Sequence, residues 1–464
     1  MIEQLFLQQK NHSLHLRKTN PRHRIDYLKT LEVLVEKNSK RFCEAIFADF
    51  KKPEFEVMAT EILPLIKEIR FAQKNLLQWT KKQTVSTPMF LFGAKSYVQY
   101  EPLGVSLIIA PYNYPVYLAL APLAAALAAG NCAILKPSEF TPNTSRLLKE
   151  LLTESFEKTH VSVVLGGAET SQELLRMPFD HVFFTGSTAV GKKIAEACAK
   201  HLVPVTLELG GKSPVIVDAS ADLDVAAEKI AWGKFVNGGQ TCVAPDYAFV
   251  HEHVYGEFIE LLGKKIAKFF GKTPEEIKSS AHFSRMIHPA HATRLSQNLK
   301  ETIAQGAEVL IGGEIDEATA YVAPTVITKA NWNSPLMQSE IFGPILPVIR
   351  YKELSQALHT INEHDKPLAL YLFSHDSLDV ERILTETSSG GVCINDVVVH
   401  LTNPNLPFGG VGASGYGKYH GFHGFKAFSN EKAVLHQRSP FKLHRLIQPP
   451  YDLAKIDFLK KLFR

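Results

Sequence analysis

The chain has 464 residues, of which 45% are hydrophobic, and its formal net charge at pH 7 is +4. A chain of this length is expected to form about two or three domains with well-buried cores. Its 51 basic and 47 acidic residues nearly balance, and only the extreme C-terminus is noticeably basic, so the composition gives little support to nucleic-acid binding.

The five cysteines lie at positions 43, 132, 198, 242 and 393, without CxxC spacing. Their odd number and scatter favour a reducing compartment over a disulfide framework or a zinc site. The nineteen histidines include no HExxH motif, and we predict no metal site. The first 20 residues lack a long apolar segment followed by small residues, so we expect no secretory signal and a cytoplasmic location.

Residues 102–135 carry no charged side chain, a run long enough to suggest a transmembrane helix. Prolines and Asn113 interrupt its first part, however, and Gly130 ends the second. We expect instead a strand at 105–110, the loop PYNYP, a helix at 116–130 and a strand at 132–136. Such uncharged elements are typical of a sheet that is buried on both faces.

Strands and helices continue to alternate along the chain. A helix is expected from Pro142, with Thr141 as its cap, followed by strands at 161–165, 181–186 and 205–209. This order predicts an α/β fold with a doubly wound parallel sheet. Ligands bind beyond the carboxyl ends of such strands, which places Asn113, Lys136 and Gly186 on one rim.

Several polar positions on this rim have two interpretations. The stretch FFTGSTAVGKKI (183–194) is either a plain tight turn or a helix N-terminus that binds phosphate through free amides, although it lacks the GxGxxG spacing. Lys136 and Glu139 of LKPSE either hold ribose hydroxyls or form a solvated surface pair. Glu208 ends an apolar strand before two glycines, where a carboxylate is either held by structural partners or functional.

Cys242 lies in NGGQTCVAPDY, directly after a helix that Asn237, Gly238 and Gly239 are expected to end. A free cysteine is often a small apolar core residue. A thiol in a glycine-rich turn can instead approach a ligand closely, as a nucleophile must.

Together these motifs resemble the aldehyde dehydrogenase family. PYNYP, LKPSE, FTGSTAVGKK, TLELGGKSP, NGGQTCVAPDY, EIFGP and LPFGGVGASGYG occur in the family's order, and the resemblance covers about residues 20–430. AWGKF, CVAPDY and NPNLPFGGVGASG are similar to the class 3 branch. Members of that branch are typically dimers that oxidise medium-chain aliphatic or aromatic aldehydes with NAD or NADP.

The resemblance implies a role for each matching residue. Cys242 is the implied nucleophile, Glu208 the general base, and Asn113 an amide that stabilises the oxyanion. The implied cofactor-binding residues are Lys136 and Glu139 on the adenosine ribose, Gly186, Ser187 and Gly191 along the pyrophosphate, and Glu340 and Phe342 at the nicotinamide. Tyr112 replaces a tryptophan that is common before the asparagine, and we expect this change to alter the substrate funnel.

The resemblance also implies the architecture: doubly wound parallel sheets in a cofactor and a catalytic domain, plus a small β oligomerisation arm. The implied dinucleotide-binding domain comprises 1–79 and 100–209, the catalytic domain 210–394, the arm 80–99 and 395–430, and the C-terminal tail 431–464. Residues 80–100 are expected to form a β-hairpin, and the arm to make a homodimer. The amphipathic end of the tail is expected to dock on the protein's own surface rather than on a membrane.

The expected reaction is NAD(P)-dependent oxidation of an aldehyde through a cysteine thiohemiacetal and a thioester. NAD should be used at least as well as NADP, because a 2′-phosphate beside Glu139 would meet like charge unless Lys136 or the loop rearranges. Two other functions remain open at this point. A cysteine hydrolase or acyltransferase would use Cys242 and Glu208 without a cofactor, and a binding protein would keep the fold without turnover.

Overall fold

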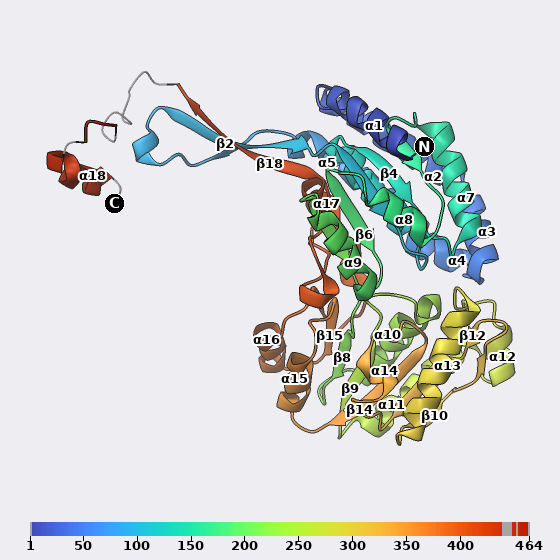
Figure 1. Ribbon diagram of the computed structural model, residues 1–464. Helices are drawn as coiled ribbons and strands as arrows, with labels where there is room; N and C mark the ends of the chain where they lie inside the picture. Colours follow the sequence, from blue (N-terminus) through green and yellow to red (C-terminus); the bar gives the residue numbers. More distant parts are fainter. Residues whose placement is uncertain (1, 439–447, 452, 463–464) are drawn as a thin grey trace.

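The computed structural model describes residues 2–438, 448–451 and 453–462. Two α/β units lie one above the other, and a narrow β arm extends away from them (Figure 1). Among the described residues, no helix is long and apolar enough to cross a membrane.

The first unit is built on a six-stranded sheet with the strand order β17-β7-β6-β3-β4-β5. Only β17 runs antiparallel to its neighbour. The strands are β3 (Val105–Ile109), β4 (Cys132–Lys136), β5 (Val161–Val163), β6 (His181–Thr185), β7 (Val205–Glu208) and β17 (Gly415–Tyr416).

Helices cover both faces of this first sheet, as the uncharged strands predict. Leu107 and Ile109 pack in one apolar cluster with residues of α1, α8 and α9, whereas Ile108 between them joins the cluster formed with α2, α3, α5, α6 and α7. The helices of this unit are α1 (Ile2–Leu16), α2 (Pro21–Lys37), α3 (Ser39–Phe50), α4 (Glu54–Val57), α5 (Leu63–Trp79), α6 (Tyr117–Ala129), α7 (Pro142–Ser155), α8 (Ala168–Leu174), α9 (Thr188–Ala199) and α17 (Gly421–Ala427). The predicted doubly wound parallel sheet is confirmed.

The second unit contains a seven-stranded sheet with the order β10-β13-β14-β9-β8-β15-β16, in which only β10 is antiparallel to its neighbour. Its strands are β8 (Pro214–Val217), β9 (Tyr247–His251), β10 (Glu308–Ile311), β13 (Thr325–Thr328), β14 (Ile345–Tyr351), β15 (Ala369–Phe373) and β16 (Gly391–Ile394), with a separate hairpin of β11 (Ile315–Asp316) and β12 (Tyr321–Val322). Its helices are α10 (Leu223–Phe235), α11 (Tyr255–Phe270), α12 (Pro274–Ser279), α13 (Pro289–Ala304), α14 (Pro335–Gln338), α15 (Leu354–Glu363) and α16 (Ser377–Glu386).

The arm is a three-stranded antiparallel sheet of β1 (Gln83–Val85), β2 (Ala94–Pro102) and β18 (Ser429–Gln437). The predicted hairpin at 80–100 is confirmed by the pairing of β1 with β2. The structure differs from the predicted arm at 395–430, because β17 in this segment joins the first sheet and α17 packs on the first unit. The predicted tail boundary at 431 falls inside β18.

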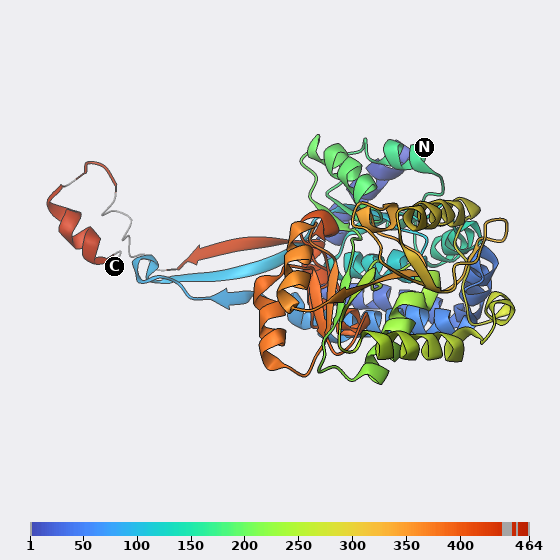
Figure 2. The same ribbon diagram turned by 90° about the horizontal axis from the view of Figure 1, so that it is seen from below.

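The tail ends in the short helix α18 (Ile456–Leu462), which lies beyond the tip of the arm (Figures 1 and 2). The expected docking of the tail on the protein's own surface stays a prediction. Residues 439–447, 452, 463 and 464 of the predicted tail lie outside the described part of the chain.

A buried ion pair fixes the start of α6, the helix that follows the PYNYP loop. Lys52 Nζ lies 2.9 Å from Glu61 Oε1, and both side chains are fully buried. The other carboxylate oxygen of Glu61 accepts the backbone N–H groups of Val116 and Tyr117 at 3.0 and 3.2 Å. A negative charge at this helix N-terminus is favourable, so Glu61 anchors the loop that carries Asn113.

We expect Glu61→Gln to lower the free energy of unfolding by about 3–5 kcal/mol, because it removes the carboxylate that pairs directly with the buried Lys52 ammonium and leaves only Glu56, whose pKa burial raises to about 7, as an acidic neighbour. Glu150→Gln is the matched control, since Glu150 pairs with Arg41 on the surface and should contribute less than about 1 kcal/mol. Urea unfolding followed by tryptophan fluorescence measures both. Equal midpoints for the two variants would contradict this role of the pair.

Candidate active site

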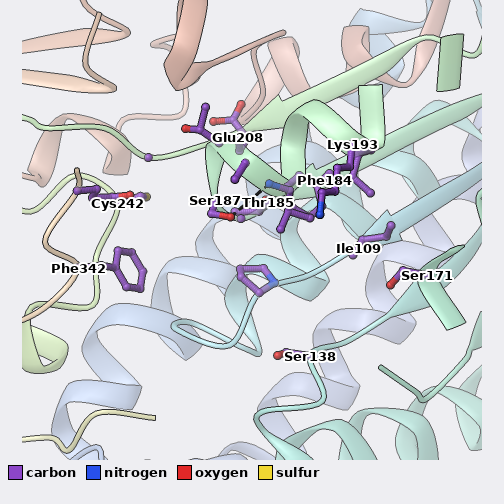
Figure 3. Close-up of a pocket in the computed structure, with 18 of the residues that line it drawn as sticks. Ile109, Ser138, Ser171, Phe184, Thr185, Ser187, Lys193, Glu208, Cys242 and Phe342 are labelled. Carbon is purple, nitrogen blue, oxygen red and sulfur yellow. Dashed lines mark hydrogen bonds between the residues drawn. The ribbon is translucent and has the colours of Figure 1, made fainter. Parts of the chain in front are cut away.

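A cavity of about 1130 Å³ lies at the carboxyl end of the first sheet, where the first unit faces the second. Figure 3 shows Cys242 and Phe342 at the left of the view, and Glu208, Thr185 and Ser187 nearer its centre. The predicted site residues that line the cavity are Asn113, Lys136, Glu139, Gly186, Ser187, Glu208, Cys242, Glu340 and Phe342. The fold therefore brings together all but one of the predicted site residues.

Gly191 is the exception. It lies in the first turn of α9, where it is buried and does not line the cavity. A Cβ atom built on Gly191 would lie 2.6 Å from a methyl carbon of Leu209. The absent side chain thus allows the helix to pack closely on the end of β7.

The turn before Cys242 has the left-handed backbone expected of its sequence. The φ angles of Asn237, Gly238 and Gly239 are 57°, 61° and 74°. A Cβ on Gly239 would lie 2.4 Å from the backbone carbon and oxygen of Gly343. The turn consequently packs against the loop that carries Glu340 and Phe342, and the half-buried Cys242 lines the cavity.

Two hydrogen bonds join this turn to the PYNYP loop of the first unit, and a third lies within the turn. Asn113 Nδ2 donates to the Gln240 carbonyl at 2.9 Å, and Asn237 Nδ2 donates to the Asn113 carbonyl at 2.8 Å and to the Gln240 carbonyl at 3.2 Å. All three residues are buried. Because an amide nitrogen has two N–H groups, Asn113 can offer its second one to a substrate oxygen.

The surroundings of Cys242 favour its protonated thiol. Burial raises the thiol pKa above its usual range, and the nearby carboxylates of Glu340 and Glu208 raise it further. The backbone N–H groups of Cys242 and Val243 act in the opposite direction. Formation of the thiolate nucleophile therefore requires a change in the charges around the sulfur.

Glu208 is a buried carboxylate without a hydrogen-bond partner. Its side chain is 3% exposed, and neither carboxylate oxygen has a donor within the described structure. Burial raises its pKa well above the ordinary value, and the positive charge of Lys418 opposes this shift. A carboxylate kept for structure would be expected to accept hydrogen bonds, so this environment favours the functional interpretation of Glu208.

Glu340 enters the cavity beside the two glycines that follow Glu208. A Cβ on Gly210 would lie 2.0 Å from one of the Glu340 carboxylate oxygens, so only glycine leaves room for this side chain. Burial raises the pKa of Glu340 to about 8, and Asp246 adds to that shift. The sequence predicted the position of Glu340 in the site but not this close packing.

The Lys212–Asp246 ion pair, which the sequence analysis did not identify, holds the Glu340 loop in place. Lys212 Nζ lies 2.5 Å from Asp246 and also donates to the carbonyls of Leu336 and Ser339. Asp246 in turn accepts the backbone N–H of Ile341. Lys212 lies in the motif TLELGGKSP and Asp246 in NGGQTCVAPDY. The presence of a charged residue in each motif is the sequence feature that could have indicated this pair.

At the far end of the cavity, Lys136 and Glu139 form an ion pair of 3.1 Å. Lys136 is nearly fully buried, whereas the Glu139 side chain is 41% exposed, so only the lysine departs from a solvated surface pair. Ser187 is the N-cap of α9 and accepts the Val190 N–H. The helix N-terminus is thus capped and lies at the cavity wall.

Tyr112 lines the same cavity as these groups. Its ring contacts Phe140, His291 and Phe342 at centroid distances of 5.9, 5.4 and 6.0 Å, and all four residues line the cavity. Its expected effect on the substrate funnel stays a prediction. His291 and Arg294, further lining residues, come from a helix without a recognisable motif and were missed.

The chain is similar to known proteins over most of its length. The protein-family model described as "Aldehyde dehydrogenase family" matches residues 6–434. The chain is 45% identical over 445 residues to 4,4'-diaponeurosporen-aldehyde dehydrogenase of Staphylococcus aureus, covering 95% of this chain and 94% of the relative. It is 43% identical over 440 residues to aldehyde dehydrogenase family 3 member A2 of Rattus norvegicus, covering 95% and 89%. A solved structure of substrate-bound Staphylococcus aureus AldH has a TM-score of 0.95 and 44% identity, covering 100% of both chains.

We expect Gly239→Ala to lower both stability and turnover strongly, because its Cβ would collide with the Gly343 backbone. Gly238→Ala is the matched control: its φ is also positive, but the nearest atoms would lie 3.5 Å away, so it should cost only about 1 kcal/mol of backbone strain. Thermal unfolding and the rate at which an alkylating reagent labels Cys242 measure the two effects. Similar losses in both variants would show that φ alone, and not close packing, constrains the turn.

Proposed function

This chain belongs to the aldehyde dehydrogenase family and is an aldehyde dehydrogenase, and we propose that it oxidises its substrate to the carboxylic acid through a thiohemiacetal and a thioester on Cys242. One observation carries this proposal. A single cavity holds a thiol, an amide donor joined to its loop, and a buried carboxylate that has no hydrogen-bond partner.

The cavity fits a nicotinamide dinucleotide, and members of the family use NAD or NADP. The Lys136–Glu139 pair would contact the adenosine ribose, the N-terminus of α9 with Gly186 and Ser187 would face the pyrophosphate, and Glu340 with Phe342 would hold the nicotinamide end. A Cβ on Gly186 would lie 2.5 Å from the Phe184 ring, so the backbone here is open only because the residue is glycine. When bound, the nicotinamide supplies the hydride acceptor.

In the first step, the sulfur of Cys242 attacks the aldehyde carbonyl and forms a thiohemiacetal. The negative charge that develops on the carbonyl oxygen is stabilised by the second N–H of Asn113 and by the backbone N–H of Cys242. Preorganised donors of this kind contribute about 3–4 kcal/mol each to the transition state. The hydrogen bonds to Gln240 hold the Asn113 amide before substrate arrives, so little reorganisation is needed.

After oxidation, the acyl group remains on Cys242 as a thioester, which water must hydrolyse. Glu208 is the proposed base that takes a proton from this water while the oxygen attacks the carbonyl carbon. Its raised pKa makes the carboxylate a stronger base than an exposed glutamate. The same raised pKa means that hydrolysis should slow as the pH falls, because the protonated carboxyl cannot accept a proton.

We further propose medium-chain aliphatic or aromatic aldehydes as substrates, with NAD used at least as well as NADP. The aromatic lining formed by Tyr112, Phe140 and Phe342 supports an apolar ligand environment. The Staphylococcus relative is named for 4,4'-diaponeurosporen-aldehyde, so this aldehyde belongs in the substrate panel. A homodimer formed through the arm and a cytoplasmic location are also proposed; the projecting arm sheet and the five free cysteines support them.

Variants of the two central residues should separate their roles. We expect Cys242→Ala to abolish dehydrogenase and esterase turnover, because it removes the nucleophile. Glu208→Gln should give one rapid burst of NADH per active site, followed by turnover slowed by roughly 10²- to 10⁴-fold, since only the water step needs the base. Absorbance at 340 nm measures the burst, and mass spectrometry should find the acyl group on the peptide that contains Cys242.

If Glu208→Gln gives neither burst nor adduct, Glu208 acts earlier, in forming the thiolate. Substantial activity in Cys242→Ala would exclude covalent catalysis. Ester hydrolysis by the wild type without NADH formation from any aldehyde would instead favour a cysteine hydrolase.

Glu139 should determine the preference between the two cofactors. We expect Glu139→Gln to raise kcat/KM for NADP relative to NAD by roughly tenfold, because it removes the negative charge next to a 2′-phosphate. Steady-state kinetics with both cofactors measure this ratio, with Glu150→Gln, at a surface position of α7 that pairs with Arg41, as the control. A wild-type enzyme that already strongly prefers NADP would refute the ribose assignment.

A further inference from the structure

Lys418 is a charged residue near Glu208 that has no role in the mechanism proposed above. It follows β17, the short strand in which Gly415 pairs with Glu208 itself. Its half-buried ammonium donates to the carbonyl of Gly409 and, at 3.2 and 3.4 Å, to those of Gly410 and Gly390. These three neutral acceptors hold the ammonium in place without neutralising its charge.

Gly409 brings this lysine and the carboxylate together. A Cβ atom built on Gly409 would lie 2.8 Å from Glu208 Oε1 and 3.0 Å from Lys418 Cδ. The carboxylate and the lysine side chain therefore approach the same point from two sides, and only a glycine leaves this space open. Glu208 makes no hydrogen bond to the lysine, so the two interact by charge across a short distance in a poorly solvated site.

We propose that Lys418 is a positioning residue that acts through Glu208: its fixed positive charge sets the pH at which Glu208 becomes able to activate water for thioester hydrolysis. This inference rests on the proposed role of Glu208 as the base. It adds a determinant of the pH range in which the enzyme can complete turnover.

The other titratable groups that face Glu208 are Cys242 and Tyr419, and His423 faces Lys418. Cys242 and Tyr419 are neutral when protonated, and burial raises the pKa of each. Lys418 is the nearby positive charge that holds the pKa of Glu208 below the value that burial alone would give. Removal of this charge should therefore raise the pKa of Glu208 and move the acidic limb of hydrolysis to higher pH.

The test compares Lys418→Met with Lys418→Arg in the full-length enzyme. Rapid quench and mass spectrometry follow the loss of the acyl group from Cys242 across a pH series, after a single burst of NADH. We expect the acidic midpoint of hydrolysis to rise by about one pH unit or more in Lys418→Met and to stay near the wild-type value in Lys418→Arg. In a Glu208→Gln background, Lys418→Met should cause no such shift, because the group that it acts on is absent.

A second measurement does not depend on turnover. The infrared band of the protonated Glu208 carboxyl, identified by its absence in Glu208→Gln, should titrate at higher pH in Lys418→Met than in the wild type. The proposal would be overturned if Lys418→Met lowered the hydrolysis rate equally at all pH values and left the midpoint and the carboxyl band unchanged. Lys418 would then have only the structural role of hydrogen-bonding the carbonyls of Gly390, Gly409 and Gly410. Failure of the wild type to form NADH would refute the proposed function, while the infrared titration would still decide the coupling.

Discussion

The active site depends on the interlocked amides of Asn113, Asn237 and Gln240. Asn113 belongs to the loop after β3 in the first unit, whereas the other two belong to the turn before Cys242 in the second. These buried hydrogen bonds fix the turn before Cys242, in the second unit, against the Asn113 loop of the first unit. Loss of one partner would leave a buried polar group unsatisfied, which is costly, so the two units are held in one arrangement at this point.

Around this junction the protein keeps several carboxylates in a poorly solvated cavity. Burial raises the pKa of Glu208 and Glu340, and their charges in turn raise the pKa of Cys242. Positive charges of lysines lower the pKa of both carboxylates. Lys418 acts on Glu208, and Lys212 acts on Glu340. The reactivity of the site is thus a balance between desolvation and a few fixed positive charges, rather than a property of any one residue.

Much of the site could be predicted because its residues occur in short local motifs. A glycine pair after an apolar strand, or before a thiol, has few structural uses, and parallel strands necessarily gather their carboxyl ends on one edge. The close packing of Gly191 on Leu209 and the contacts of the Tyr112 ring could not be predicted, because they join segments that are distant in the sequence. His291 and Arg294 were missed because helix α13 (Pro289–Ala304) carries no local signal and enters the site only through long-range packing.

The amino-acid sequence by itself determined the alternation of strands and helices and the buried parallel sheet, because these depend on local periodicity. The candidate thiol, amide and carboxylate followed instead from the resemblance of their motifs to a known family. Only the tertiary structure decided that 429–437 completes the arm and that β17 returns to the first sheet beside Glu208. It also decided that Lys418 lies near that carboxylate and that Lys52 is buried with Glu61. No sequence pattern around these residues indicates that they lie close together, because the contacts form only when the chain folds.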